Sequence, residues 1–146
     1  MMLDNQIENT NIVTAENAVI GRLASIIAKR LLNGESIIIV DADKGIISGK
    51  ADFTAAKYRG RWRIKTKSNP LKGPFYPRKS DQILRRTVRG MLPFIKSKGK
   101  EAYSRLRVYS DIPEYLKERE IEVISESQKL NPKSSYISLK KLNTKI

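Results

Sequence analysis

The stretch that most constrains the fold is the apolar run Ser36–Ala42. It consists mainly of β-branched residues with no polar alternation, which is typical of a strand buried on both faces. Such strands occur in parallel sheets that helices cover on both sides. The run therefore predicts an α/β layer fold with a parallel sheet.

An amphipathic helix is expected immediately before this strand. From about Val19, apolar residues recur every three to four positions, at Ile20, Leu23, Ile27 and Leu31. Asn33-Gly34 then supplies the left-handed residue that often ends a helix. A short strand at Asn11–Ala15 comes earlier, so strand, helix and apolar strand together predict a right-handed βαβ unit.

The composition limits the number of domains and the kinds of functional site that the chain can have. With 146 residues, 40% of them hydrophobic, we expect a single domain, 1–146, with a flexible leader at 1–10. There is no cysteine and no histidine, which removes thiolate metal sites and the commonest general base. No apolar run approaches the ~18 residues of a membrane span, and the polar leader is unlike a secretory signal. We expect a cytoplasmic protein with no cofactor, metal, membrane or small-molecule substrate.

Positive charge is concentrated in one third of the sequence. From Lys57 to Arg107 there are seventeen of the 29 Lys and Arg residues against two acids, Asp81 and Glu101, a net charge of +15. The rest of the chain holds twelve basic and thirteen acidic residues. So many cations destabilise a compact chain unless a polyanion neutralises them, which predicts a nucleic-acid partner. The expected nucleic-acid-binding residues are Lys57, Arg59, Arg61, Arg63, Lys65, Lys67, Lys72, Arg78, Lys79, Arg85, Arg86, Arg89, Lys96, Lys98, Lys100, Arg105 and Arg107.

Asp41 and Asp43 follow the apolar strand, at the end where α/β folds commonly place ligands. Paired acids can bind a metal, but no third ligand accompanies them. We therefore interpret both as turn residues or as partners of nearby arginines.

The segment Gly45–Ala51 resembles a phosphate-binding loop without satisfying its pattern. Three residues rather than four separate the glycines, and the residue after Lys50 is an alanine without a hydroxyl for magnesium. We expect a strand-to-helix turn instead, with Ser48 or Gly49 as the N-cap and Asp52 in the first turn. Free amides there, with the lysine, could still hold a backbone phosphate.

The helix after this turn is expected to continue past Tyr58 into the basic segment. Trp62 is interpreted first as a core residue, because indoles are usually well buried, with base stacking as the alternative. From Lys65 to Lys79 three prolines and a glycine forbid a helix, and the loop is too basic and long to pack comfortably. Phe75 and Tyr76 in its middle either stack on bases or anchor the loop to the body.

A second amphipathic helix follows the loop. Ser80 is the expected N-cap, and Pro93 ends the helix. Its apolar stripe is Ile83, Leu84, Val88, Met91 and Leu92, with Arg85, Arg86 and Arg89 on the opposite side. An ordinary solvated helix would mix acids with bases, whereas arginine suits phosphates. Lys96, Lys98 and Lys100 extend this patch, and Arg105–Tyr109 alternates like a strand with one buried face.

Here the sequence resembles a known family. Arg85–Pro93, followed by Leu106–Tyr109, resembles the signature region of the ribosomal protein L13 family of the large subunit. Further resemblances, in the family's order, are Ala15–Ser25, Ile38–Ala42, Gly73–Tyr76 and Asp111–Pro113, the last two typical of the archaeal and eukaryotic branch. The match covers 12–113 and leaves 114–146 as a C-terminal extension. It implies a three-layer α/β/α fold with a small, mostly parallel sheet, and a structural role on large-subunit ribosomal RNA, beside other large-subunit proteins. The nucleic acid that the seventeen cations bind is then expected to be RNA.

The extension differs in character. Its acids reverse the charge, at Glu114, Glu118, Glu120, Glu122 and Glu126, and its apolar residues Ile121, Val123 and Ile124 could pack on the body. Ser125–Ser135 has the composition of a linker. Tyr136–Leu139 alternates weakly and could add a strand or dock on a neighbour.

Two functions are compatible with these features of the sequence. The first is a structural ribosomal protein that positions ribosomal RNA, supports subunit assembly and translation, and has no catalytic residues. The alternative is an RNA-processing or RNA-modifying enzyme on an α/β scaffold, since a fold alone determines no function. The lack of histidine, cysteine, a glycine-rich cofactor turn and a complete phosphate loop favours the first.

Overall fold

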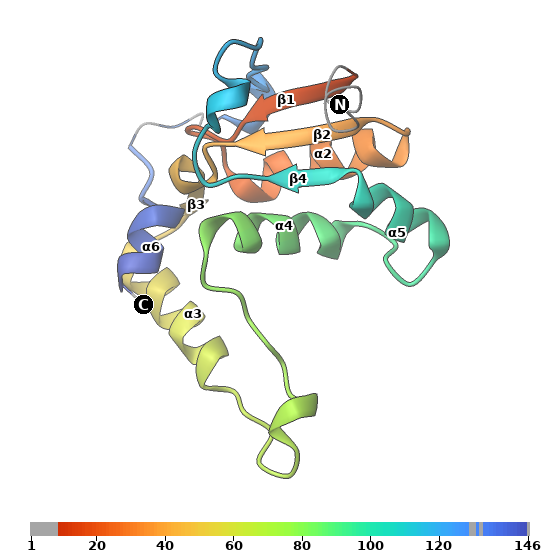
Figure 1. Ribbon diagram of the computed structural model, residues 1–146. Coiled ribbons are helices and arrows are strands. Elements are labelled where there is room, and N and C mark those ends of the chain that lie inside the picture. Colours follow the sequence, from red (N-terminus) through yellow and green to blue (C-terminus); the bar gives the residue numbers. More distant parts are fainter. Residues whose placement is uncertain (1–8, 129–130, 132, 146) are drawn as a thin grey trace.

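The computed structural model describes residues 9–128, 131 and 133–145 (Figure 1). Most of the expected leader therefore lies outside the described residues. The strands are β1 (Thr10–Thr14), β2 (Ser36–Val40), β3 (Ile46–Ser48), β4 (Leu106–Val108) and β5 (Tyr136–Ser138). The helices are α2 (Ile20–Leu32), α3 (Ala51–Arg63), α4 (Ser80–Met91), α5 (Ser97–Ser104) and α6 (Leu139–Lys145). Short 3-10 helices are η1 (Ala42–Lys44), η2 (Pro70–Lys72), η3 (Glu114–Leu116) and η4 (Ser125–Ser127). No helix of this described part is long and apolar enough to cross a membrane.

The apolar strand β2 lies at the centre of a three-stranded parallel sheet of order β1-β2-β4. Ile38 pairs with Ile12 of β1 on one side and with Arg107 of β4 on the other. Four consecutive residues of β2, from Ile37 to Val40, are buried. The expected α/β class with a small, mostly parallel sheet is thus confirmed.

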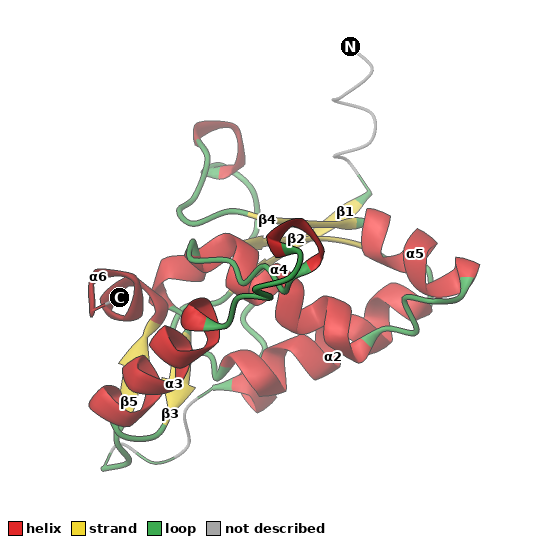
Figure 2. Cartoon of the chain, turned by 90° about the horizontal axis from the view of Figure 1, so that it is seen from below, coloured by secondary structure: helices red, strands yellow, loops and turns green. Residues whose placement is uncertain are grey.

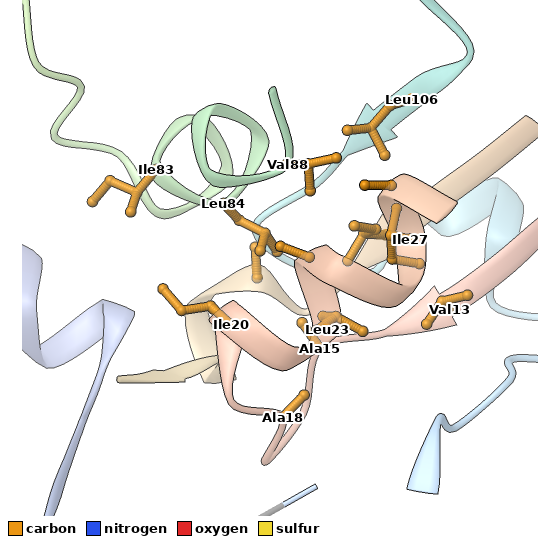
Figure 3. Close-up of a cluster of buried hydrophobic side chains, with 14 of the residues drawn as sticks. Val13, Ala15, Ala18, Ile20, Leu23, Ile27, Ile83, Leu84, Val88 and Leu106 are labelled. Atoms are coloured by element: carbon orange, nitrogen blue, oxygen red, sulfur yellow. The ribbon is translucent and has the colours of Figure 1, made fainter. Parts of the chain in front are cut away.

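The main core lies between this sheet and the helices α2 and α4. Ile37 and Ile39 point to this face, because side chains alternate along a strand. The apolar stripe of α2 meets Leu84 and Val88 of α4 and Leu106 of β4 (Figure 3). The chain leaves α2 through Gly34, whose φ of 100° is the left-handed conformation that the sequence predicts there.

The opposite face of the sheet has an irregular cover. Ile38 and Val40 pack there with Ile12 and with Leu116 of η3. The layer on this face is therefore a loop with a 3-10 helix, whereas long helices cover the other face (Figures 1 and 2).

Residues 45–51, expected to form a turn, hold the strand β3. It pairs antiparallel with β5, with Ile47 opposite Ile137. The amide of Gly49 extends this pairing by donating to Ser135 O at 2.9 Å. The N-cap of α3 is Lys50, so the prediction of Ser48 or Gly49 as the cap is wrong. Pairing with a distant strand, which the local pattern does not reveal, moves the start of the helix.

Two details of α4 differ from expectation. The N-cap is Lys79 rather than Ser80, and the buried hydroxyl of Ser80 instead accepts a hydrogen bond from Asn143 Nδ2 at 2.9 Å. Met91 is 43% exposed and does not belong to the buried stripe, since the last residue of the helix extends beyond the surface that covers it. Pro93 does follow the helix end, as predicted.

The C-terminal extension contributes directly to the main core. Leu139 and Leu142 of α6 are fully buried there, together with Ile137 of β5. Lys145 donates to Asp52 Oδ1 at 2.7 Å and holds the pKa of that carboxyl below its usual value. The extension is thus joined to the N-terminal end of α3.

Residues 121–128 pack more closely than a linker would. Ile124 is buried, whereas Val123, also expected to pack, is 60% exposed. Ser127 is buried, and its carbonyl accepts the amide of Val19 at 2.8 Å. The predicted linker therefore cannot begin at Ser125, and its residues 129, 130 and 132 lie outside the described residues.

Candidate nucleic-acid interface

The acidic pair at the end of β2 lies in a turn. Asp41 is buried, with a left-handed φ of 56°, and its Oδ1 accepts from Lys44 Nζ at 3.1 Å. This hydrogen bond raises the pKa of Lys44 above its usual value. In the described part of the chain no three acidic residues lie close enough together to hold a metal. Asp41 is thus a turn residue with a lysine partner rather than an arginine partner.

The basic residues follow an arm and a helix. The arm (residues 64–79) leaves the end of α3, passes through η2 and returns as an extended stretch to α4, far from the sheet (Figure 1). Residues 64–72 are all exposed, as the predicted loop requires, and Leu71 is 86% exposed. The arm therefore carries Lys65, Lys67 and Lys72 into solvent.

Each arginine of α4 stacks on an aromatic ring from a different element. The guanidinium carbon of Arg85 lies 4.8 Å from the ring centroid of Tyr103 in α5, and that of Arg89 lies 4.1 Å from Phe94. Arg86 stacks on Tyr76 at 4.5 Å. These contacts fix the direction of side chains that would otherwise move freely in solvent.

Arg86 also holds the arm. Its Nη1 donates to the backbone carbonyl of Phe75 at 2.6 Å. The Tyr76 ring is partly buried against this arginine, while the Phe75 side chain is 71% exposed. The two aromatic residues therefore have different roles. Tyr76 anchors the returning segment of the arm to the body, and Phe75 exposes its ring to solvent, where it is available for stacking on a base.

Trp62 is not a core residue, so that interpretation is wrong. It is partly buried outside the main hydrophobic cluster, with Arg78 5.1 Å from its ring and Tyr58 edge-on at 6.5 Å. Its indole nitrogen is buried without a hydrogen-bond partner among the described residues. Arg61 stacks on the Tyr58 ring at 5.1 Å. The arm thus begins and ends at one aromatic and arginine cluster.

Fifteen of the seventeen predicted cations are exposed; Arg61 and Arg105 are half-buried. Among the described residues none of the seventeen forms an ion pair, whereas Arg30, Lys44 and Lys145 elsewhere are all paired with carboxylates. The structure therefore brings together a cationic surface without internal neutralisation. We call it the cationic face: the arm, the last turns of α3, and the exposed sides of α4 and α5.

Arg105 stands apart from this surface. Its Nη2 donates at 2.7 Å to the carbonyl of Leu31, at the C-terminal end of α2 where carbonyls lack helical partners. A cation there also interacts favourably with the helix dipole. Its position predicts a role in stability. Arg107 lies exposed on β4, at the edge of the sheet and away from the arm.

Sequence reasoning missed the helix α5. It carries Lys98 and Lys100, and it begins beside Pro93 because buried Gly99 leaves room for the backbone carbonyl of that proline. The residues of α5 have no clear apolar period, and the close backbone approach at Gly99 is visible only in the folded structure. The pairing of each arginine with its ring likewise has no local signal, since the partners lie in separate elements.

An exposed, unneutralised set of fixed arginines is typical of proteins that bind nucleic acids, through phosphate contacts and stacking on bases. Comparison with known proteins points to one group of them. Residues 8–115 match the family model described as ribosomal protein L13. This range contains the whole cationic face.

Curated relatives agree with the family match. The chain is 48% identical over 121 residues to the large ribosomal subunit protein uL13 of Methanosphaera stadtmanae, covering 82% of this chain and 85% of the relative. It is 44% identical over 133 residues to that of Methanocaldococcus jannaschii, covering 90% and 93%. The protein of the same name from Archaeoglobus fulgidus is 40% identical over 134 residues, covering 90% and 84%.

The chain belongs to the ribosomal protein L13 family. The resemblance found in residues 12–113 is thereby confirmed, and these relatives are archaeal, as that resemblance implies. The family consists of ribosomal proteins rather than enzymes, so the chain is not an enzyme and the alternative of an RNA-modifying activity is set aside.

Proposed function

We propose that this protein is a structural constituent of the large ribosomal subunit in the cytoplasm, and that its cationic face binds and positions large-subunit ribosomal RNA. The single observation that carries the proposal is the set of exposed cations without carboxylate partners in the described chain. In a free protein these charges repel one another, and RNA phosphates neutralise them. Neighbouring large-subunit proteins are the remaining partners, and assembly and translation are the processes served.

The whole chain acts as one domain in this proposal. The family region and the extension share the main core, because Leu139 and Leu142 pack with the helices α2 and α4. The cationic face is therefore attached to a single packed body, which suits a protein that fixes the relative positions of RNA segments.

Sedimentation at graded salt tests this function. The tagged protein in a cell lysate should co-sediment with the large subunit at low salt and leave it only at high salt. With purified large-subunit RNA, each neutralised phosphate should contribute about −0.7 to −0.9 to the slope of log affinity against log salt concentration. Binding that does not respond to ionic strength would contradict the proposal, as would sedimentation away from the subunit at low salt.

A further inference from the structure

A hollow of about 610 Å³ lies where α4 ends and the chain turns into α5. This size falls in the range of roughly 300–1,000 Å³ that is usual for pockets binding small organic molecules. The hollow is lined by Arg86, Arg89, Gly90, Leu92, Pro93, Phe94, Ile95 and Lys96. Its apolar residues are contiguous in the chain, and every charged residue that lines it is a cation. The lining therefore suits a ligand with an apolar surface and a negative charge.

The walls of the hollow are held in place. Arg89 lies 4.1 Å from the Phe94 ring, and Tyr103 of α5 supports that ring edge-on at 5.4 Å. Ile95, by contrast, is 96% exposed, although burying such a side chain would stabilise the fold. An isoleucine so exposed beside a fixed arginine is available for contact with a ligand.

Gly90 faces the same hollow, and no internal contact requires a glycine there. A Cβ at this position would meet no atom within 4 Å, and the backbone is not left-handed. Glycine destabilises the interior of a helix relative to alanine. The fold thus gains nothing from this glycine, whereas a ligand that approaches the bare backbone of α4 would need it.

We propose that this hollow binds one unpaired nucleotide of the RNA. The base would stack on the Arg89 guanidinium and contact Ile95, since single-stranded bases commonly stack on arginine planes and apolar side chains. Its flanking phosphates would contact Arg86 and Lys96, which border the hollow. A paired base, covered by its neighbours in the duplex, cannot enter. This inference rests on the proposed RNA-binding function and specifies the part of the RNA that is recognised.

Filling the hollow tests the inference without removing a charge. Gly90→Leu should weaken binding to a purified large-subunit RNA transcript about tenfold or more, the loss expected for one stacked base. The salt slope should fall by at most about two units, because only the contacts of the two flanking phosphates with Arg86 and Lys96 can be lost. Gly21→Leu is the matched control: Gly21 is an exposed glycine of α2, a Cβ there would meet no atom within 4 Å, and the residue lines none of this hollow. Its affinity should equal that of the parent.

Ultraviolet crosslinking identifies the ligand in the same complex. In the parent complex, the peptide containing residues 93–96 should carry a nucleotide that chemical probing of the complex shows to be unpaired, and Gly90→Leu should abolish this adduct. Unchanged affinity of Gly90→Leu, or an adduct with a base-paired nucleotide, would overturn the inference while leaving phosphate binding intact. A parent protein that fails to bind the transcript at any salt would refute the proposed function as well.

Discussion

Gly99 shows how one missing side chain can determine the shape of the cationic face. It is buried at the start of α5, and a Cβ there would overlap the carbonyl oxygen of Pro93 and lie 2.9 Å from the amide nitrogen of Phe94. These are backbone atoms, which cannot rotate away as the end of a side chain can. The close approach places Phe94 beneath Arg89, so a local steric requirement affects the position of an arginine.

Gly99→Ala should therefore destabilise the protein by on the order of 1–3 kcal/mol, the usual cost of inserting an atom into a packed region. Urea unfolding monitored by circular dichroism measures this change. Gly60→Ala, on the exposed surface of α3 where a Cβ meets nothing within 4 Å, should be neutral or slightly stabilising. Equal stability of the two variants would show that α5 can move away from Pro93 at no cost.

Ile38 and Lys67 separate the core from the binding surface. Ile38 is 3% exposed at the centre of the sheet, so Ile38→Asp would bury a carboxylate without a partner and should unfold the protein. Lys67 is exposed in the arm, and Lys67→Ala should leave the melting temperature unchanged while weakening RNA binding modestly. Thermal melts and filter binding on both variants test this pair; the opposite ranking in the melts would show the core assignment to be wrong.

At the scale of elements, α4 has two functions on opposite sides. Its buried side, with Leu84 and Val88, packs in the main core, while its arginines are exposed. These arginines connect three elements, since Arg85 stacks on α5, Arg86 on the arm and Arg89 on the turn between α4 and α5. The helix thus positions both parts of the cationic face relative to the core.

Replacing Arg85, Arg86 and Arg89 together by Gln should lower the salt slope of RNA binding by about 2–3 units, because up to three phosphate contacts are lost. The helix propensities are similar, so the backbone should tolerate the change. The melting temperature should fall by several degrees, since three exposed cation–π contacts of about 0.5–1 kcal/mol each are lost. Salt titrations of binding and thermal melts measure the two effects.

Two controls accompany the triple variant. Lys at the same three positions should restore the slope more fully than the affinity, because an ammonium lacks the two-pronged geometry of arginine. Arg105→Gln removes one charge that is hydrogen-bonded to Leu31 O, so it should reduce stability and leave the slope nearly unchanged. If the triple Gln variant kept the parent slope, the arm rather than α4 would be the main phosphate-binding element.

At the scale of the whole molecule, the extension completes the body that supports the cationic face. Leu142 of α6 is fully buried in the main core although it lies near the C-terminal end of the sequence. Leu142→Ala should lower the free energy of unfolding by about 2–5 kcal/mol, measured by urea denaturation. RNA affinity per folded molecule should not change, since this side chain is buried in the main core and is not exposed on the cationic face. Lys140→Ala, an exposed change in the same helix, is the control; a loss of stability as large as that of Leu142→Ala would show that α6 packs through its other side.

The sequence by itself determined those elements whose buried side can be recognised from the spacing of their own apolar residues. The apolar run of β2, the three-to-four spacing of α2 and the stripe of α4 each predict an element and its buried side, because period and burial are linked within a single segment. The charge of the segment 57–107 is also a property of sequence alone. Which of its seventeen cations bind RNA stays a prediction.

Only the tertiary structure decided the contacts between segments that are far apart in the sequence. The pairing of β3 with β5, the burial of α6 and the contact of Arg105 with Leu31 each join segments far apart in the chain. The stacking of the α4 arginines on three rings, and the bare surface of Gly90 beside the hollow, are equally non-local. The physical reason is that burial and stacking depend on which surfaces meet after the chain has folded, and no local period records that choice.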